Sequence, residues 1–280
     1  MALPIYQSSG ALSTGFSSVN VGYPSVINAD DILLMIVAND RNTPPGVPTG
    51  WTLINSDFSS TTSVLSYMCC WKRALGTETG SVTVTTGVPL FGVIHRYSDA
   101  ITSGSIIDGA IIEDAIGAVA RASTSVSISG NSTSKKIYLG VIGEINAAVN
   151  QSSVDWTVRS NLHSAYQNDM SLFLADSSDI TSTNASIDNV GGGQMGSFAF
   201  LMKGSAPAST TEQEGFRFRN DDGSETTATW KDNQDVNITQ AKNVATRLRI
   251  LTDTVNDSPT AQITLQYKRT DENANEWRNV

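Results

Sequence analysis

Short apolar or alternating runs, each closed by turn-forming residues, recur along most of this chain. Asp31–Ala38 (D-I-L-L-M-I-V-A) is continuous and apolar, as is typical of a strand covered on both faces. A loop with three prolines, Asn39–Gly50, follows it and is incompatible with a strand ladder. Only Ile106–Ala120 has an apolar spacing that also allows a short helix, although Gly109 and Gly117 weaken it. The pattern predicts an all-β chain of many short strands, without alternating strands and helices.

A small, polar, proline-broken run, Lys203–Glu214 (K-G-S-A-P-A-S-T-T-E-Q-E), divides the chain into two unlike parts. Residues 1–203 carry 9 basic and 15 acidic residues, whereas the much shorter remainder, residues 204–280, carries 9 and 12. We predict a jelly-roll-like β-sandwich domain over 1–203 and a linker over 204–214. A small immunoglobulin- or fibronectin-like β-sandwich domain is predicted over 215–280.

Hydroxyl-bearing residues dominate the composition. The chain is 39% apolar and 16% charged, and it contains 35 Ser and 29 Thr. Thr suits a pleated surface and Ser suits turns, so this bias favours strands and loops. Disorder is the competing interpretation of such a chain. The repeated apolar runs argue against it, because their burial can compensate the entropy lost on ordering.

The charge and the first residues argue against several classes of protein. A formal net charge of −9 and a pI of about 4.6 are unlike the basic surface of a nucleic-acid binder. Met1–Gly10 shows no basic segment followed by an apolar core, and no apolar run reaches membrane-spanning length. We therefore expect no nucleic-acid partner, no membrane insertion, no signal peptide and synthesis in a host cytoplasm.

The two cysteines, Cys69 and Cys70, are adjacent within a strand-like run. Neighbouring strand residues point to opposite faces, so a disulfide between them would distort the backbone. We expect two buried free thiols.

Two histidines limit the catalytic chemistry that is available. His95 alternates with apolar neighbours in F-G-V-I-H-R-Y, and His163 lies in a polar stretch. A histidine-based zinc site or a Ser-His-Asp triad would need one of them at its centre. The chain contains no G-x-S-x-G elbow, H-E-x-x-H motif or Walker loop. We predict no catalytic, cofactor-binding or metal-binding residues, no cofactor and no enzymatic activity.

Acidic residues offer the one hint of glycoside cleavage. Asp108, Glu113 and Asp114 form a small cluster, and with Glu144 they could be paired carboxylates. No aromatic-rich groove accompanies them, since aromatic residues make up only 7% of the chain. Surface acids are the simpler explanation.

Two further segments are weak candidates for ligand loops. Asp221, Asp222 and Glu225 in N-D-D-G-S-E lack the spacing of an EF-hand, so a solvated hairpin tip explains them better than calcium. Gly191–Gly193 is followed by no helix and has no lysine nearby, which favours a flexible turn over a phosphate-binding loop.

Arginines near the end of the chain occur in two i, i+2 pairs, Arg217/Arg219 and Arg247/Arg249. Each pair places both guanidinium groups on one face of its strand. They either form a basic stripe for an acidic partner or pair across strands with Asp and Glu, and we favour the latter. Trp230 is expected in the core of the small domain, the alternative being an exposed platform for a ligand.

Several stretches resemble structural proteins of tailed bacteriophages. In the first part these are D-D-I-L-L-M-I-V-A, P-T-G-W-T-L-I, Y-M-C-C-W-K-R-A-L-G-T-E-T-G-S-V-T-V-T and F-G-V-I-H-R-Y-S-D-A. In the second part, G-F-R-F-R-N-D-D-G-S-E-T-T-A-T-W, N-I-T-Q-A-K-N and L-Q-Y-K-R-T-D-E-N-A-N-E-W-R-N-V resemble a module appended to virion proteins. These are turn and core residues, so the resemblance implies a fold and a context but no functional residue.

The resemblance implies a non-enzymatic virion structural protein, a capsid decoration or head-fibre protein. Its expected partners are further copies of itself, in a homo-oligomer such as a trimer, and the major capsid protein or another virion protein. A low charge density with many Ser, Thr and Gly residues suits the broad interfaces that such packing requires. The alternative is a tail fibre or receptor-binding protein that recognises host surface carbohydrate. A polysaccharide depolymerase is a third, weaker reading.

Overall fold

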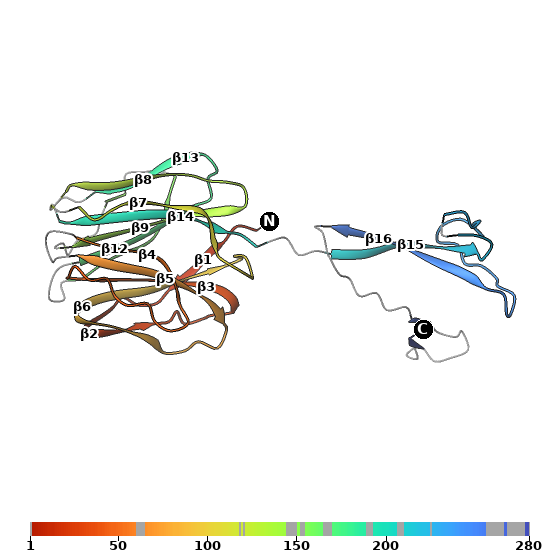
Figure 1. The fold of residues 1–280 in the computed structure, drawn as a ribbon, viewed down its shortest axis with the longest axis horizontal. Helices are drawn as coiled ribbons and strands as arrows, with labels where there is room; N and C mark the ends of the chain where they lie inside the picture. The colour runs from red at the N-terminus through yellow and green to blue at the C-terminus, as the bar shows by residue number, and fades with distance from the viewer. Residues whose placement is uncertain are drawn as a thin grey trace. The chain divides into compact units, whose positions relative to one another are not determined.

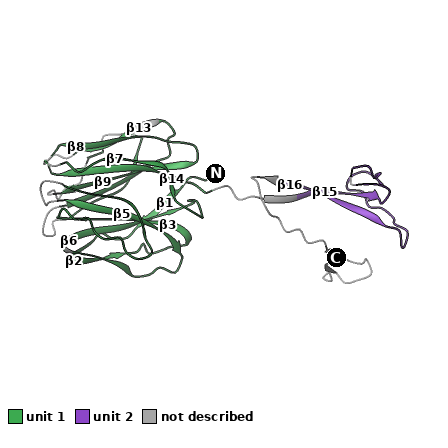
Figure 2. Ribbon diagram, viewed as in Figure 1, with its two compact units in different colours: residues 1–206 green, residues 207–280 purple. Residues whose placement is uncertain are grey.

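Strands are the only extended regular structure in the described part of the chain, which confirms the all-β prediction (Figure 1). The computed structural model describes residues 2–59, 65–117, 119, 121–143, 150–151, 155–164, 170–188, 193–205, 210–224, 226–255, 266–267 and 278–279. The chain divides into two compact units, unit 1 (residues 1–206) and unit 2 (residues 207–280) (Figure 2).

The first half of unit 1 forms one six-stranded antiparallel sheet. Its strands are β1 (Ile5–Ser9), β2 (Ser13–Gly22), β3 (Ala29–Asn39), β4 (Thr52–Phe58), β5 (Ser66–Leu75) and β6 (Ser81–Ser98). They pair in the order β1-β6-β3-β5-β4, and β2 also pairs with β6. The long β6 pairs with three strands: residues 81–92 pair with β2, residues 90–97 with β3 and residues 95–98 with β1.

The second half of unit 1 forms two more antiparallel sheets. A five-stranded sheet has the order β11-β12-β9-β14-β7, and a three-stranded sheet has the order β10-β13-β8. These strands are β7 (Ile107–Asp114), β8 (Ser123–Ser129), β9 (Ser134–Gly143), β10 (Asn150–Gln151), β11 (Thr157–Ser164), β12 (Met170–Ser177), β13 (Ser182–Asp188) and β14 (Met195–Lys203). The sheets are those of a β-sandwich. Its jelly-roll type is not confirmed, because the strands of the two halves do not alternate between sheets.

The segment that allowed a short helix is a strand, β7, so the helical alternative is wrong. Gly109 has a φ of +82° in this strand, a value that a glycine adopts without steric cost. The register between β7 and β14 shifts beside it, between Ala199 and Leu201. The glycine that weakened a helix instead serves an irregularity in the strand.

Three hydrophobic clusters lie between and outside these sheets. The central cluster joins β3, β5 and β6 to β9, β12 and β14, for example through Tyr67 and Phe198, whose rings stack at 5.5 Å. A second cluster lies between β2 and the outer face of the first sheet, and a third lies under β8 and β13. Residues Asp31–Asn39 of β3 are all buried, as predicted for a strand covered on both faces.

The cysteines lie in two different clusters. Cys69 belongs to the central cluster and Cys70 to the outer one beside β2, and both are free and fully buried. Burial raises the pKa of both thiols, so each stays protonated. The prediction of two buried free thiols on opposite faces of a strand is confirmed.

Unit 2 contains two described two-stranded ribbons. One pairs β15 (Thr210–Asn220) with β16 (Thr246–Val255), and the other pairs β17 (Gln266–Tyr267) with β18 (Arg278–Asn279). The hairpin predicted between residues 216–219 and 226–230 is present only in part. Trp230 bridges to Arg219, and backbone hydrogen bonds run from Asn220 N to the Thr229 carbonyl and from Lys231 N to the Phe218 carbonyl, whereas the long ladder of β15 forms with β16. The immunoglobulin- or fibronectin-like type of this unit stays a prediction.

The structure narrows the linker that was predicted over residues 204–214. Gly204 bridges to Ala100 and Ser205 bridges to Ala2, so both belong to unit 1. At the other end, β15 begins at Thr210. The polar composition of this run did not prevent its last residues from joining a ladder, since Thr is at home in strands.

We expect residues 1–206 to fold without the rest of the chain, because all three hydrophobic clusters lie within them. The fragment should be monodisperse and should unfold cooperatively within about 3 °C of the corresponding transition in the full chain, as measured by calorimetry. A fragment of residues 1–105 is the control. It lacks one side of the central cluster and should not give a cooperative transition, and a fragment 1–206 that behaves like it would contradict the expectation.

Candidate functional site

The acidic residues considered for catalysis are held as hydrogen-bond acceptors. Asp108 accepts from Asn131 Nδ2 at 3.0 Å and Ser134 Oγ at 2.7 Å, and these bonds lower its pKa. Asp114 pairs with Arg121 at 2.9 Å. Burial raises the pKa of Asp114, but its hydrogen bonds outweigh this and the net direction is also downward. A general acid at neutral pH needs a raised pKa, so neither carboxylate suits that role.

Glu113 connects the two sheets of the sandwich. Its Oε1 accepts hydrogen bonds from Tyr67 Oη at 2.9 Å and Asn55 Nδ2 at 3.0 Å. Burial and the neighbouring Glu113 raise the pKa of Tyr67, which stays a donor. Glu144, the fourth acid, lies outside the described residues. The structure gives these acids separate hydrogen-bond partners and brings no carboxylate pair into view among the residues it describes.

His95 contacts a serine but lacks the third member of a triad. Its Nε2 lies 3.5 Å from Ser160 Oγ, and within the described residues its Nδ1 has no hydrogen-bond partner. In a triad an acidic side chain orients the histidine through this nitrogen. Complete burial lowers the pKa of His95 to about 3, so the ring is neutral. His163 lies exposed on β11.

A buried carboxylate ties the two sheets together near His95. Asp176, 1% exposed, accepts hydrogen bonds from Arg159 Nε and Nη2, both at 2.9 Å. Tyr97 Oη donates from the opposite sheet at 3.2 Å, and Lys135 Nζ lies at 3.5 Å. A buried charge with this many partners is satisfied, and removing one partner typically costs about 3–5 kcal/mol. We interpret this network as structural.

The loops considered for metal or phosphate are partly described. Asp221 pairs with Arg247 at 2.6 Å, and Asp222 accepts from the Thr229 amide at 2.9 Å. Glu225 and residues 191–192 lie outside the described residues. Within the part that the structure describes, no three His, Cys, Asp or Glu side chains gather closely enough to hold a metal ion. That part also contains no helix long and apolar enough to cross a membrane.

Four arginines of unit 2 lie on one face of the β15–β16 ribbon. The register places Arg217 opposite Arg249 and Arg219 opposite Arg247. Because strand side chains alternate, the other face carries the apolar set Phe216, Phe218, Leu248 and Ile250. The sequence predicted that the two arginines of each pair share a face of their strand. It did not predict that the two pairs lie opposite each other, because this register joins strands that are 26 or more residues apart in the sequence.

Trp230 is an exposed residue of this face. The guanidinium of Arg217 lies 4.3 Å from the centroid of its ring, and that of Arg219 lies 4.5 Å away. Trp230 is 39% exposed, whereas Arg219 is 4% exposed and donates to the Ala228 carbonyl. The expectation of a buried Trp230 is wrong, although its segment is bonded to β15 through the bridge to Arg219 and through backbone hydrogen bonds on either side of it. The alternative, an exposed Trp230 side chain, is the one observed.

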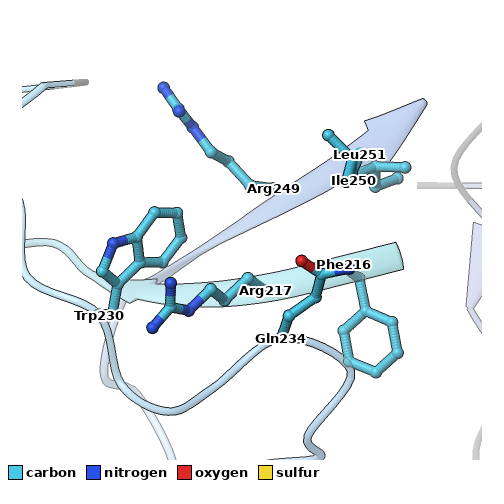
Figure 3. Close-up of a pocket in the computed structure, with 7 residues that line it drawn as sticks. All are labelled: Phe216, Arg217, Trp230, Gln234, Arg249, Ile250 and Leu251. Carbon is cyan, nitrogen blue, oxygen red and sulfur yellow. The ribbon is translucent and has the colours of Figure 1, made fainter. Parts of the chain in front are cut away.

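A cleft of about 360 Å³ opens beside the indole (Figure 3). It is lined by Phe216, Arg217, Trp230, Gln234, Arg249, Ile250 and Leu251. Arg217 Nε donates to the Asp232 carbonyl at 2.7 Å, and in the described residues its two terminal nitrogens have no hydrogen-bond partner. The cleft thus combines the available terminal nitrogens of Arg217 with an aromatic ring and aliphatic surface, which is a set suited to binding an anionic organic group.

Comparisons of the chain with protein-family models, with curated proteins and with solved structures found no match.

The stability of unit 1 should fall as the pH drops below about 6.5. The pKa of His95 is lowered from 6.5 to about 3 by burial, so over this interval the unfolded chain binds a proton that the folded chain excludes. The contribution is complete above pH 6.5 and is lost at up to about 1.4 kcal/mol per pH unit below it. Urea unfolding between pH 7 and pH 4.5 should show this slope.

Two variants test the assignment to His95. His95→Gln should flatten the slope even if it lowers the stability at pH 7, whereas His163→Gln, at an exposed position on β11, should leave it unchanged. An unaltered slope in His95→Gln would show that another group is responsible.

Proposed function

We propose that this chain is a non-enzymatic structural protein of a tailed-bacteriophage particle, a capsid decoration or head-fibre protein on the virion surface. The observation that carries the proposal is the use of the chemically capable residues of unit 1. Asp108, Glu113, Asp114, Asp176 and His95 either hold strands together or lie buried. Because these described polar groups bond within the fold of unit 1, we expect the unit to act through contacts of its surface. The phage-like stretches supply the context, and they include β3 and β5 of the central core.

Exposed apolar side chains on unit 1 support a role in packing against other proteins. Phe16 is 56% exposed, Phe58 is 47% exposed and Leu75 is 72% exposed. Side chains of this kind serve as anchors in interfaces, where a few residues supply most of the binding energy. We propose contacts with further copies of the chain, in a trimer, and with the major capsid protein or another virion protein. In this proposal unit 1 is jelly-roll-like and unit 2 is immunoglobulin-like.

A second candidate function is a tail-fibre or receptor-binding protein that recognises host carbohydrate. The exposed Trp230 and the cleft beside it favour this candidate, because an exposed aromatic ring with polar neighbours is what a carbohydrate site needs. A depolymerase has no comparable support from the described residues.

Incorporation into particles should survive the loss of any single polar candidate. Alanine variants at Asp108, Glu113, Asp114 and His163 that remain folded should enter purified virions within about threefold of the wild-type level, because interface energy resides in apolar anchors. Phe16→Ser and Leu75→Ser should reduce incorporation more strongly. Quantitative mass spectrometry of particles measures this, and an electron-microscopy map of the virion locates the chain.

An enzyme would give a different result. Removal of an acid–base group typically costs a factor of about 10²–10⁴ in rate and leaves the fold intact. A folded, incorporated variant that had lost a polysaccharide-degrading activity would overturn the structural proposal, as would a map in which the chain is absent from the particle.

A further inference from the structure

We propose that the cleft beside Trp230 binds the carboxylate of an acidic sugar, a uronic or sialic acid residue of a surface polysaccharide. This inference rests on the receptor-binding candidate above and names both its site and its ligand class. The first observation is that two positively charged side chains lie at the cleft. Arg217 and Arg249 lie opposite each other on neighbouring strands, and both line the cleft (Figure 3).

Arg217 is the residue that would hold the carboxylate. Its Nε is bound to the Asp232 carbonyl and its guanidinium lies 4.3 Å from the centroid of the indole of Trp230. These two contacts fix the plane of the guanidinium and leave the terminal nitrogens as donors. A fixed planar fork matches the two oxygens of a carboxylate, and fixing it in advance reduces the entropy lost on binding.

The rest of the cleft suits a sugar ring. Leu251, 48% exposed, and the edge of the indole offer apolar surface to the C–H groups of a pyranose. The amide of Gln234 donates to Asp235 through Nε2 at 3.3 Å, which leaves its carbonyl oxygen for a sugar hydroxyl. A volume of about 360 Å³ lies at the lower end of the range for small-molecule sites, enough for a short saccharide.

The described acids near the cleft have other hydrogen-bond partners. Asp235 accepts from the Phe216 amide at 2.8 Å and from Gln234, and Asp232 contacts Arg217 through its backbone carbonyl. Asp221 pairs with Arg247, which does not line the cleft. Inorganic phosphate would satisfy Arg217 but would leave the apolar wall unused. A nucleic acid would need several aromatic rings for its bases, and Trp230 and Phe216 are the only ones lining this cleft.

The test is calorimetric titration of the full chain with tetragalacturonic acid, with 6′-sialyllactose and with the methyl ester of the tetragalacturonate. At least one of the two acidic saccharides should bind, the methyl ester should not bind, and added salt should weaken binding. Arg217→Gln, Arg249→Gln and Trp230→Ala should each weaken binding by at least about tenfold, the effect of losing a charge-assisted hydrogen bond or its support. Arg249 is exposed, so its variant keeps the test valid if Trp230→Ala fails to fold.

Arg247→Gln is the matched control. It removes the same charge from the same face, but outside the cleft, and should bind like the wild type. Absence of binding to both acidic saccharides, equal binding of the methyl ester, or tighter binding of polyphosphate or single-stranded DNA would each overturn the inference. Particle incorporation is a separate readout. A chain that binds the saccharide but is absent from virions contradicts the proposed function and leaves this inference standing. A chain that is incorporated but does not bind the saccharide contradicts this inference and leaves the proposed function standing.

Discussion

Burial of the central strands on both faces is the constraint on which the rest of unit 1 depends. A strand such as β3 or β9, apolar on both sides, needs a second sheet on one face and a further layer on the other. The chain supplies the further layer twice, with β2 over the first sheet and with β8 and β13 over the second. Two glycines allow these layers to approach. A Cβ at Gly92 would lie 2.7 Å from Val21, and one at Gly140 would lie 2.3 Å from Ile187.

The closed sandwich contains buried polar groups, and several of the described ones bond across elements. Asp31 pairs with Arg96 at 2.6 Å between β3 and β6, and Asp176 receives donors from both sheets. Such pairs contribute little net stability relative to apolar packing, but they are costly to leave unsatisfied. A slipped strand would separate them, so they penalise other registers. His95 Nδ1 is one of several buried polar atoms without a hydrogen-bond partner among the described residues, and burial keeps this ring neutral.

The sequence predicted what depends on local pattern and failed where distant segments decide. The all-β class, the two-sided burial of Asp31–Ala38 and the opposite faces of the cysteines follow from alternation and length alone. The long ladder between β15 and β16 does not, because N-D-D-G indicates only the local pairing of β15 with residues 229–231. The prediction that Trp230 is buried was wrong because it, too, depends on distant segments. Its strand-like spacing is real, but burial depends on which segment covers it.

The β15–β16 ribbon shows how such a non-local choice creates a site. Like charges directly opposite each other on neighbouring strands are unfavourable, yet the register aligns Arg217 with Arg249 and Arg219 with Arg247. Part of this repulsion is offset within the unit, by the indole of Trp230 beside two of the arginines and by Asp221 beside a third. A carboxylate bound beside Arg217, as proposed above, would offset more of it. The alignment of like charges, unfavourable for the ribbon by itself, is thus consistent with the anion site proposed above.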